Sequence, residues 1–264
     1  MAIYKCFPGG KFKALTMSYD DGSVDDRRLV NLFNQNGIKG TFNITSGWLE
    51  KPDKIHREEL KELYKGHEVA SHTYSHPTLE RCPLTEVVEE IMKDRKELES
   101  IMGHPIRGMA YPNGSYSKEI VNLLPSLGIE YSRIVGDTDN FGIPDNFLTW
   151  KSTCHHDHNL MENAKRFAEA SKSQYMFLMY VWGHSYEFSR DNTWELIEEF
   201  CRYIGGREDI WYATNIEIVD YMKLVNNLKF SASHDMVYNP SANSAWIAVN
   251  GQIEEIKGGE QVNL

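Results

Sequence analysis

Residues 14–22 read Ala-Leu-Thr-Met-Ser-Tyr-Asp-Asp-Gly, an apolar and strand-prone run that stops abruptly at two carboxylates and a glycine. This pattern predicts a buried β-strand, and Gly22 lets the chain turn sharply where the strand ends. Asp20 and Asp21 repel each other unless a cation or a basic partner lies beside them. The stretch is therefore either an ordinary surface turn or the edge of a charged site.

A second stretch favours the charged site. Residues 68–76, Glu-Val-Ala-Ser-His-Thr-Tyr-Ser-His, also run from a short apolar strand into polar residues, and they place His72 and His76 four residues apart. One carboxylate and two imidazoles make an open three-ligand metal site, which leaves a coordination position for water. Together, the two stretches predict a metal site at the ends of two strands.

Composition limits the class of protein. The chain has 264 residues, of which 41% are hydrophobic and 25% charged, enough for one large domain with a substantial core. A formal net charge of -10 argues against nucleic acid or an anionic membrane surface as the main partner. No apolar run approaches the ~20 residues of a spanning helix, and residues 1–8 lack the features of a secretory leader. The 4 cysteines are widely scattered and indicate no disulfide framework, so we expect a cytoplasmic protein.

Strand-like and helix-like segments alternate along most of the chain. Helices are expected at residues 25–35, 54–65, 85–102, 117–127, 160–170, 193–204 and 216–226. Strands after the first are expected at residues 39–44, 68–71, 107–111, 131–135, 147–153, 175–182 and 210–214. Repeated strand–helix units with apolar strands favour a parallel sheet, and at this length a barrel.

The placement of polar residues agrees with this architecture. They gather after the predicted strands, where α/β barrels carry their chemistry. An open doubly wound sheet would collect them at the same edge, so the pattern indicates a site more firmly than a closed barrel. Residues 231–264 instead alternate around Asn-Gly and Gly-Gly, which predicts a β-hairpin tail packed on the same domain as residues 1–230.

Three motifs resemble a known family. Ser-Tyr-Asp-Asp-Gly at 18–22, Ser-His-Thr-Tyr-Ser-His at 71–76 and Tyr-Pro-Asn-Gly at 111–114 are similar to the first three signature motifs of the polysaccharide deacetylases, the NodB-homology carbohydrate esterases. The similarity extends roughly from Lys13 to Met222. Tyr-Ser-Arg at 131–133 and the stretch 150–156 most resemble the branch grouped with gellan lyase.

The resemblance implies both a fold and an activity. The fold is α/β, a distorted (β/α) barrel of the polysaccharide deacetylase type with fewer than eight regular strands, here followed by a short C-terminal β appendage. The activity is hydrolysis of an acetyl group, most often N-acetyl, from a poly- or oligosaccharide, with one divalent metal ion, usually zinc. Residues 1–230 would form the deacetylase barrel.

Carried over position by position, the resemblance makes Asp20 the general base and assigns the metal to Asp21, His72 and His76. An ion held by two neutral imidazoles and one carboxylate keeps positive charge, polarises the acetyl carbonyl and lowers the pKa of bound water towards ~7. A nearby carboxylate that is not a ligand can then accept the proton of that water. The third motif makes the N–H of Asn113 a donor to the oxyanion.

His184, in Tyr-Val-Trp-Gly-His-Ser at 180–185, matches the final histidine of the family and would protonate the leaving nitrogen. In the family an aspartate orients this histidine. Its counterpart here is not evident, and both Asp139 and Asp157 are candidates.

A second departure concerns the arginine that holds the base in the family, because Ala110 stands at its position. We expect Arg133 to replace it, since a guanidinium in mid-strand needs a buried carboxylate partner. Arg107 is the alternative, although an arginine at the start of a strand is more often solvated.

Further residues are expected to line the site. His155, His156, His158 and Asp157 could form another metal site, but adjacent residues on a strand point to opposite faces. We therefore expect His156 to line the substrate pocket. Aromatic side chains near strand ends could stack on a sugar, and those expected to do so are Tyr74, Tyr111 and Trp182.

The sequence thus predicts a metal-dependent deacetylase that acts on an acetylated carbohydrate. One alternative is hydrolysis of another C–N bond, as in allantoinase-like relatives of the same fold. The other is a carbohydrate-binding protein that keeps the fold without catalysis. The intact acid, base and ligand set favours the enzyme, whereas the missing arginine at position 110 favours the binding protein.

Overall fold

The computed structural model describes residues 2–264, and its centre is a mostly parallel sheet. Nine strands form this sheet in the order β7-β6-β5-β4-β3-β2-β9-β8, with β10 paired to β2. Their bounds are β2 Lys13–Asp20, β3 Gly40–Ile44, β4 Glu68–Ser71, β5 Gly108–Ala110, β6 Tyr131–Asp137, β7 Trp150–Ser152, β8 Cys154–His155, β9 Phe177–Gly183 and β10 Ile210–Tyr212.

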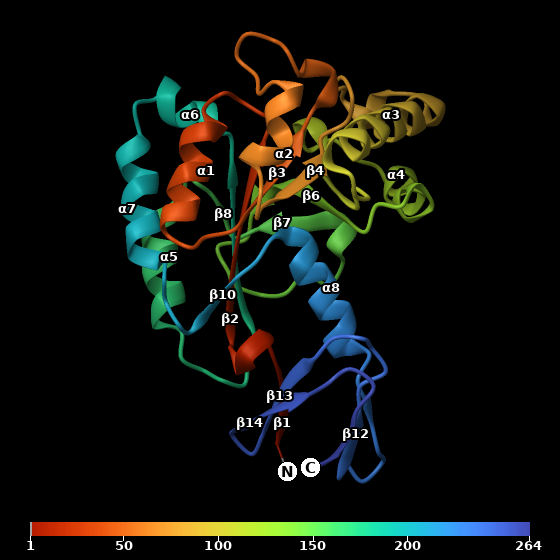
Figure 1. The fold of residues 1–264 in the computed structure, drawn as a ribbon, viewed down its shortest axis with the longest axis vertical. Helices are drawn as coiled ribbons and strands as arrows, with labels where there is room; N and C mark the ends of the chain where they lie inside the picture. The colour runs from red at the N-terminus through yellow and green to blue at the C-terminus, as the bar shows by residue number, and fades with distance from the viewer. Residues whose placement is uncertain (1) are drawn as a thin grey trace.

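Helices surround the sheet. They are α1 Asp26–Gln35, α2 Leu60–Leu63, α3 Leu84–Met102, α4 Lys118–Leu123, α5 Leu160–Glu169, α6 Ser185–Arg190, α7 Trp194–Ile204 and α8 Asn215–Asn226. Helices α5, α6 and α7 lie on one side of the strands, and α2, α3 and α4 lie on the other (Figure 1). Within residues 2–264, no helix combines the length and the apolar character needed to cross a membrane.

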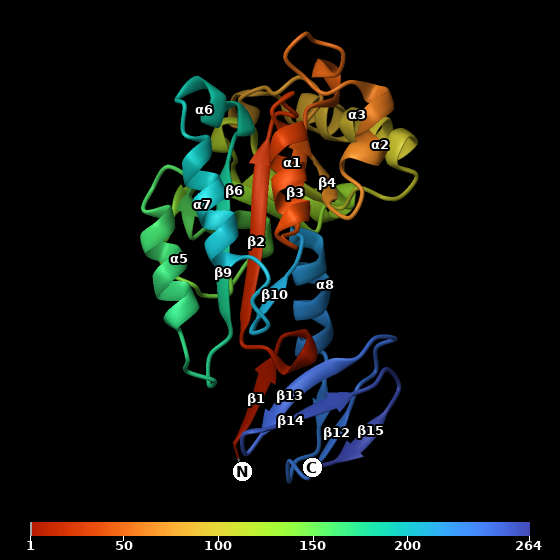
Figure 2. The same ribbon diagram turned by 60° about the vertical axis from the view of Figure 1, so that its left-hand side comes forward.

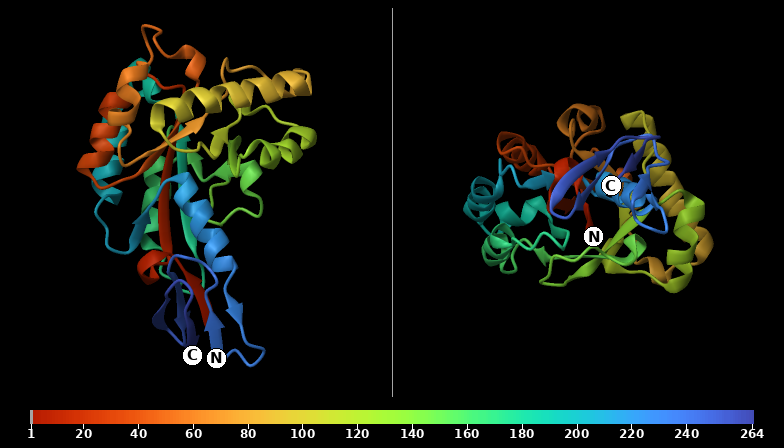
Figure 3. Two further views of the ribbon diagram at one scale, coloured as in Figure 1. Left: turned by 45° about the vertical axis from the view of Figure 1, so that its right-hand side comes forward. Right: turned by 90° about the horizontal axis from the view of Figure 1, so that it is seen from below.

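The two ends of the sheet meet in one segment of chain. Strands β7 and β8 are consecutive and are separated only by Thr153, yet β7 pairs with β6 and β8 pairs with β9. The Thr153 N–H donates to the Tyr180 carbonyl at 2.7 Å, so the segment crosses from one end of the sheet to the other. The ladder is incomplete there, and the helices enclose the strands when the molecule is seen from below (Figure 3). The predicted distorted (β/α) barrel is confirmed.

The predicted elements agree with the structure except in a few places. The helix expected at 54–65 is reduced to α2 and a short 3-10 turn. The backbone before it pairs elsewhere, because the Ile55 N–H donates to the Gly22 carbonyl and Lys54 forms an isolated antiparallel β-bridge with Ser23. Tertiary pairing therefore overrides the helical pattern of this segment. Helix α6 and strand β8 were not predicted, and the single strand expected at 147–153 is a 3-10 turn at 147–149 followed by β7.

The C-terminal residues cover the end of the barrel opposite the carboxyl ends of its strands. The predicted hairpin is present as β13 Ala245–Val249 and β14 Gln252–Ile256, and the unpredicted strand β1 Ile3–Cys6 pairs with β13. Strands β11 Lys229–Phe230, β12 Met236–Tyr238 and β15 Gln261–Asn263 form a second small sheet. Ile247 and Ile256 of the tail share one buried cluster with Leu178 and Tyr180 of β9. Both termini lie at this end of the molecule (Figure 2).

A buried carboxyl group fastens α1 to α6. Asp26, the first residue of α1, accepts hydrogen bonds from the Ser185 hydroxyl at 2.5 Å and the Tyr64 hydroxyl at 2.7 Å. Burial raises the pKa of Asp26 to about 7. The folded protein therefore holds this proton more tightly than the unfolded chain does.

We expect Asp26 to make stability fall with rising pH. Its contribution is fully present below the pKa of the unfolded chain, about 4, and is lost as the pH rises through about 7. Asp26→Asn should flatten the fall of the free energy of unfolding across this window, measured by urea denaturation at several pH values. Asp25→Asn, at the more exposed neighbouring position, is the matched control. Equal slopes for wild type and Asp26→Asn would show that Asp26 is ionised throughout.

Candidate functional site

The end of β2 brings two carboxylates to the rim of the barrel. The strand is buried along its whole length, and positive φ angles at Asp21 (79°) and Gly22 (61°) turn the chain directly after Asp20. Both carboxylates approach one imidazole, because Nε2 of His72 lies 3.8 Å from Asp20 Oδ2 and 3.7 Å from Asp21 Oδ1. Two neighbouring residues of an extended strand would point apart, so the turn is what lets both reach the site.

Asp21, His72 and His76 form a group that could hold a metal ion. Nε2 of His76 lies 3.8 Å from Asp21 Oδ1, the same oxygen that His72 approaches. Nδ1 of His72 donates to the Ala110 carbonyl at 2.8 Å, which leaves the lone pair of Nε2 free on the side of the carboxylates. Burial lowers the pKa of His72 to about 4, so the ring is neutral.

An orphaned oxygen supports this donor set. Asp21 Oδ1 is buried and has no hydrogen-bond partner among residues 2–264. A buried carboxylate oxygen without a donor is costly, and a divalent cation would satisfy it. Two imidazoles and one carboxylate suit zinc and similar ions, so the residues present fit the metal that the sequence predicted.

Arg133 holds the second carboxylate. Its guanidinium donates to Asp20 Oδ2, and Asn43 Nδ2 donates to Asp20 Oδ1 at 2.8 Å. Burial raises the pKa of Asp20, but Arg133, His72, His184 and Asn43 together hold it below its usual value. The carboxylate is therefore ionised, and the contact expected between Arg133 and Asp20 is present.

The alternative arginine lies elsewhere. Arg107 pairs with Glu130 and Asp220 near the surface, away from Asp20. Parallel pairing places Arg133 of β6 directly beside Ala110 of β5. The third motif predicted an arginine in β5. The guanidinium comes instead from the neighbouring strand β6, at the same level of the sheet. Arg133 makes a second contact. Its guanidinium lies over the Trp182 ring, 4.2 Å from the ring centroid.

His184 approaches the same oxygen of Asp20 as Arg133 does, and Glu187 orients it. Nε2 of His184 is 4.0 Å from Asp20 Oδ2, and its Nδ1 is 3.2 Å from Glu187 Oε2. The His184 backbone N–H also donates to Glu187 Oε2, at 3.1 Å. Burial lowers the pKa of His184, but Glu187 and Asp20 outweigh it and raise the pKa above its usual value.

Neither aspartate expected to orient His184 does so. Asp139 accepts from Asn163 at 3.3 Å, and Asp157 lies beside His155 and His156. Glu187 was missed because it belongs to α6, the helix that was not predicted. The available signal was a carboxylate three residues after a histidine at a helix start, since Glu187 and His184 form a reciprocal capping box.

The other residues expected at the site differ in accessibility. Asn113 is exposed in the turn after β5 with φ 56°, and Tyr74 is half-buried with Lys93 3.5 Å from its ring. Trp182 is 9% exposed and lies under Arg133. Tyr111 and His156 are buried, so neither presents a surface on which a sugar could stack.

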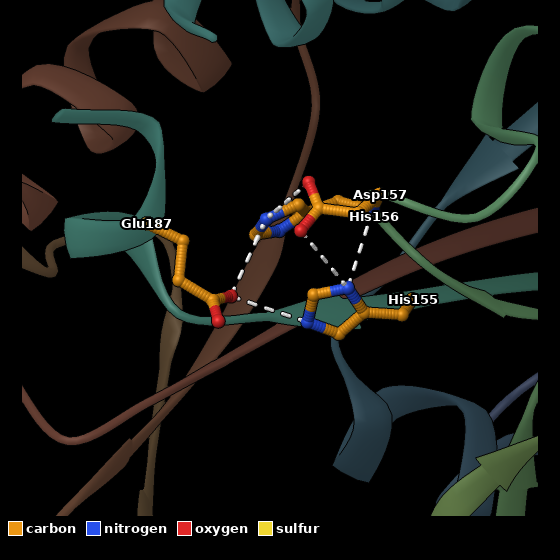
Figure 4. Close-up of side chains that lie close together, drawn as sticks. All are labelled: His155, His156, Asp157 and Glu187. Atoms are coloured by element: carbon orange, nitrogen blue, oxygen red, sulfur yellow. Dashed lines mark hydrogen bonds and ion pairs between the residues drawn. The ribbon is translucent and has the colours of Figure 1, made fainter. Parts of the chain in front are cut away.

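The expected arrangement of the adjacent histidines is wrong. Strand β8 ends at His155 and the chain turns, so the rings of His155 and His156 lie side by side with centroids 4.4 Å apart. Both approach Glu187, and with Asp157 they form a compact polar cluster (Figure 4). Alternation of side chains fails here because it holds only while the strand continues.

Comparison with known proteins agrees with the motifs. Residues 9–132 match the family described as Polysaccharide deacetylase. The chain is similar to the peptidoglycan-N-acetylglucosamine deacetylase PgdA of Listeria monocytogenes, 28% identical over 41% of this chain and 23% of that protein. It is also similar to a chitooligosaccharide deacetylase of Bradyrhizobium sp., 24% identical over 44% of this chain and 53% of that protein. The matches therefore span less than two thirds of these relatives.

A solved structure supports the fold. The chain is similar to a putative polysaccharide deacetylase from Mycobacterium smegmatis, with a TM-score of 0.64 and 17% identity over 84% of this chain and 94% of that one. At this identity the likeness bears on the fold alone. The resemblance predicted from the motifs is confirmed.

The buried ion pair can be tested without any assay of function. Removing one partner leaves an uncompensated buried charge, which typically costs about 3–5 kcal/mol of stability. We expect Arg133→Met to destabilise the metal-free protein strongly, and the double variant with Asp20→Asn to recover much of that loss. Urea denaturation of both single variants and of the double variant measures the coupling. Additive losses would contradict a direct interaction.

Proposed function

We propose that this chain, a member of the polysaccharide deacetylase family, is a metal-dependent hydrolase that removes an N-linked acetyl group from a carbohydrate. The observation that carries the proposal is the approach of both Asp20 and Asp21 to His72, with His76 and His184 completing the group. One carboxylate then belongs to a ligand set, and the other, held by Arg133, is left for proton transfer.

The names of two relatives support an N-acetylated sugar as the substrate. One is a peptidoglycan-N-acetylglucosamine deacetylase and the other a chitooligosaccharide deacetylase. We therefore propose an oligo- or polysaccharide that contains N-acetylglucosamine.

Asp21, His72 and His76 would hold the divalent ion, with zinc favoured by its ligand types. Such an ion supplies Lewis acidity, which polarises the acetyl carbonyl and makes water a stronger acid. Asp20 accepts the proton of the attacking water. Arg133 and Asn43 keep Asp20 ionised and fixed in direction.

His184 donates a proton to the leaving amine. Glu187 binds Nδ1 of His184, so Nε2 faces Asp20 and the reacting bond. A carboxylate in this position also favours the imidazolium form, which is the form able to donate. The N–H of Asn113, in the exposed turn after β5, is the proposed donor to the oxyanion, and Tyr74 is the proposed sugar contact.

The proposed ligand set can be tested by metal content. His76→Ala should bind about one divalent ion per chain fewer than wild type, because two ligands alone hold zinc weakly. Elemental analysis after dialysis against zinc measures the difference. His104→Ala, at an exposed histidine outside the site, should match wild type. Unchanged metal content in His76→Ala would remove His76 from the site.

Two substrates distinguish the proposed roles of Asp20 and His184. Asp20→Asn keeps the size of the side chain but cannot accept a proton, so kcat should fall by ~10²–10⁴ on both an N-acetyl sugar and an activated acetyl ester. His184→Ala should lose a similar factor on the N-acetyl sugar and much less on the ester, whose leaving group needs little protonation. Acetate release at matched metal occupancy measures both.

Three results of that assay would contradict the proposal. If Asp20→Asn hydrolyses both substrates as fast as wild type, the mechanism is wrong. If wild type hydrolyses only other C–N bonds, the allantoinase-like alternative replaces it. If wild type binds acetylated sugars and releases nothing, the chain is a carbohydrate-binding protein.

A further inference from the structure

We propose that His155, His156, Asp157 and Glu187 form a second divalent-cation site, separate from the Asp21–His72–His76 group. Strand β8 and the turn that follows it supply the first three residues, and α6 supplies Glu187 (Figure 4). The four side chains come from two segments that meet beside the proposed acid His184, with which Glu187 also interacts.

Three pairs of potential ligand atoms have the spacing found around a small tetrahedral ion. Glu187 Oε2 lies 3.2 Å from His155 Nε2 and 3.4 Å from His156 Nε2, and Asp157 Oδ1 lies 3.3 Å from His156 Nε2. With metal–ligand distances of about 2.0–2.1 Å, the ligand atoms of tetrahedral zinc are about 3.3–3.4 Å apart. Ligand atoms of all four residues lie within 4.8 Å of one another, so side-chain rotations are enough to enclose zinc or cobalt.

His156 provides an independent indication. Its side chain has no exposed surface, and neither ring nitrogen has a hydrogen-bond partner among residues 2–264. Stacking on Phe188 (4.2 Å between centroids) and Tyr19 (5.8 Å) fixes the ring, and its Nε2 lies near Asp157 and Glu187 without a hydrogen bond to either. A buried imidazole nitrogen without a partner is costly, and a cation bound at Nε2 would remove that cost.

Gly183 makes this position of His156 possible. A Cβ atom at residue 183 would lie 2.0 Å from Nδ1 of His156. Only glycine lets the backbone of β9 approach the ring so closely, so the imidazole is held against the strand end. Rigid ligands lose little freedom on binding, which favours a preformed site.

The charges suit a closed site for a divalent ion. Two carboxylates balance a charge of two, and burial lowers the pKa of His156 to about 3, so that ring is a neutral ligand. Nδ1 of His155 accepts from the Asp157 N–H at 3.2 Å, which places the proton of this ring on Nε2. Binding at Nε2 would move that proton to Nδ1, which would give up the hydrogen bond from the Asp157 N–H and could donate to Asp157 Oδ2, 3.8 Å away, after a small rotation. Four protein ligands leave no open position, so the site is structural or regulatory.

Glu187 connects this site to catalysis, and this consequence alone rests on the proposed function. Glu187 Oε2 accepts from the His184 N–H and approaches His184 Nδ1. A cation bound at Oε2 would compete with His184 Nδ1 for this oxygen. Excess metal should therefore inhibit a deacetylase in which Glu187 orients His184.

The test is a metal titration of the full chain. Chelator-treated wild type should bind about two zinc ions, His76→Ala about one, the combined variant His155→Gln/Asp157→Asn about one, and the variant with all three substitutions none. Two ligands are replaced together because Asp157→Asn alone leaves two imidazoles and a carboxylate, which still suit zinc. Cobalt should give tetrahedral d–d absorption in His76→Ala that disappears in the variant with all three substitutions. His158→Gln, which alters a neighbouring exposed histidine, is the matched control.

The outcomes distinguish the two sites. If wild type binds only about one ion and His76→Ala binds none, there is no second site. A second ion that survives in His155→Gln/Asp157→Asn also overturns the proposal, as does one lost only in His158→Gln. If His76→Ala keeps the wild-type content while His155→Gln/Asp157→Asn loses an ion, the second site stands and the ligand set of the proposed function fails.

Discussion

The site depends on one buried ion pair, between Arg133 and Asp20, which are 113 residues apart in the chain. The register of the parallel strands creates it. Asp20 of β2 is level with Asn43 of β3, Ser71 of β4 is level with Met109 of β5, and Ala110 is level with Arg133 of β6. Asp20 ends β2, whereas Arg133 lies within β6, and the curvature of the barrel brings the two side chains into contact.

This pair supplies the contact that the motifs predicted for Asp20, but from a different residue. The third motif predicted an arginine at position 110, but the small Ala110 gives its carbonyl to His72, and the guanidinium comes from the adjacent strand. Glu187 likewise binds Nδ1 of His184, which we had expected an aspartate to do, and it lies three residues after that histidine. In both cases the charge comes from a residue at a sequence position that the motifs do not predict. Such changes escape a motif that is read residue by residue.

The sequence was informative wherever a residue's role follows from its own strand. The buried runs before Asp20 and His72 identified the two rim segments, and the cost of an isolated guanidinium identified the partner of Arg133. The sequence did not predict the role of a residue where that role depends on the point at which a strand ends or on the path of the loop after it. Residue 155 ends β8, which brings His155 and His156 together, and α6 is too short to show a helical period. The N-terminal strand β1 was missed because its partner, β13, is more than two hundred residues away.

The carboxylates at the rim outnumber the cationic side chains that contact them, which favours the binding of a cation there. Asp20, Asp21 and Glu187 are carboxylates, and Arg133 is the one guanidinium that contacts any of them inside the barrel. His72 is neutral, because burial lowers its pKa, and cannot compensate Asp21. His184 can compensate Glu187 when it is protonated, and its pKa is raised for that reason. Asp21 is then the carboxylate without a partner, and its buried Oδ1 faces both His72 and His76. A metal ion at this point would neutralise the remaining charge and leave Asp20 free for the proton transfer that we propose.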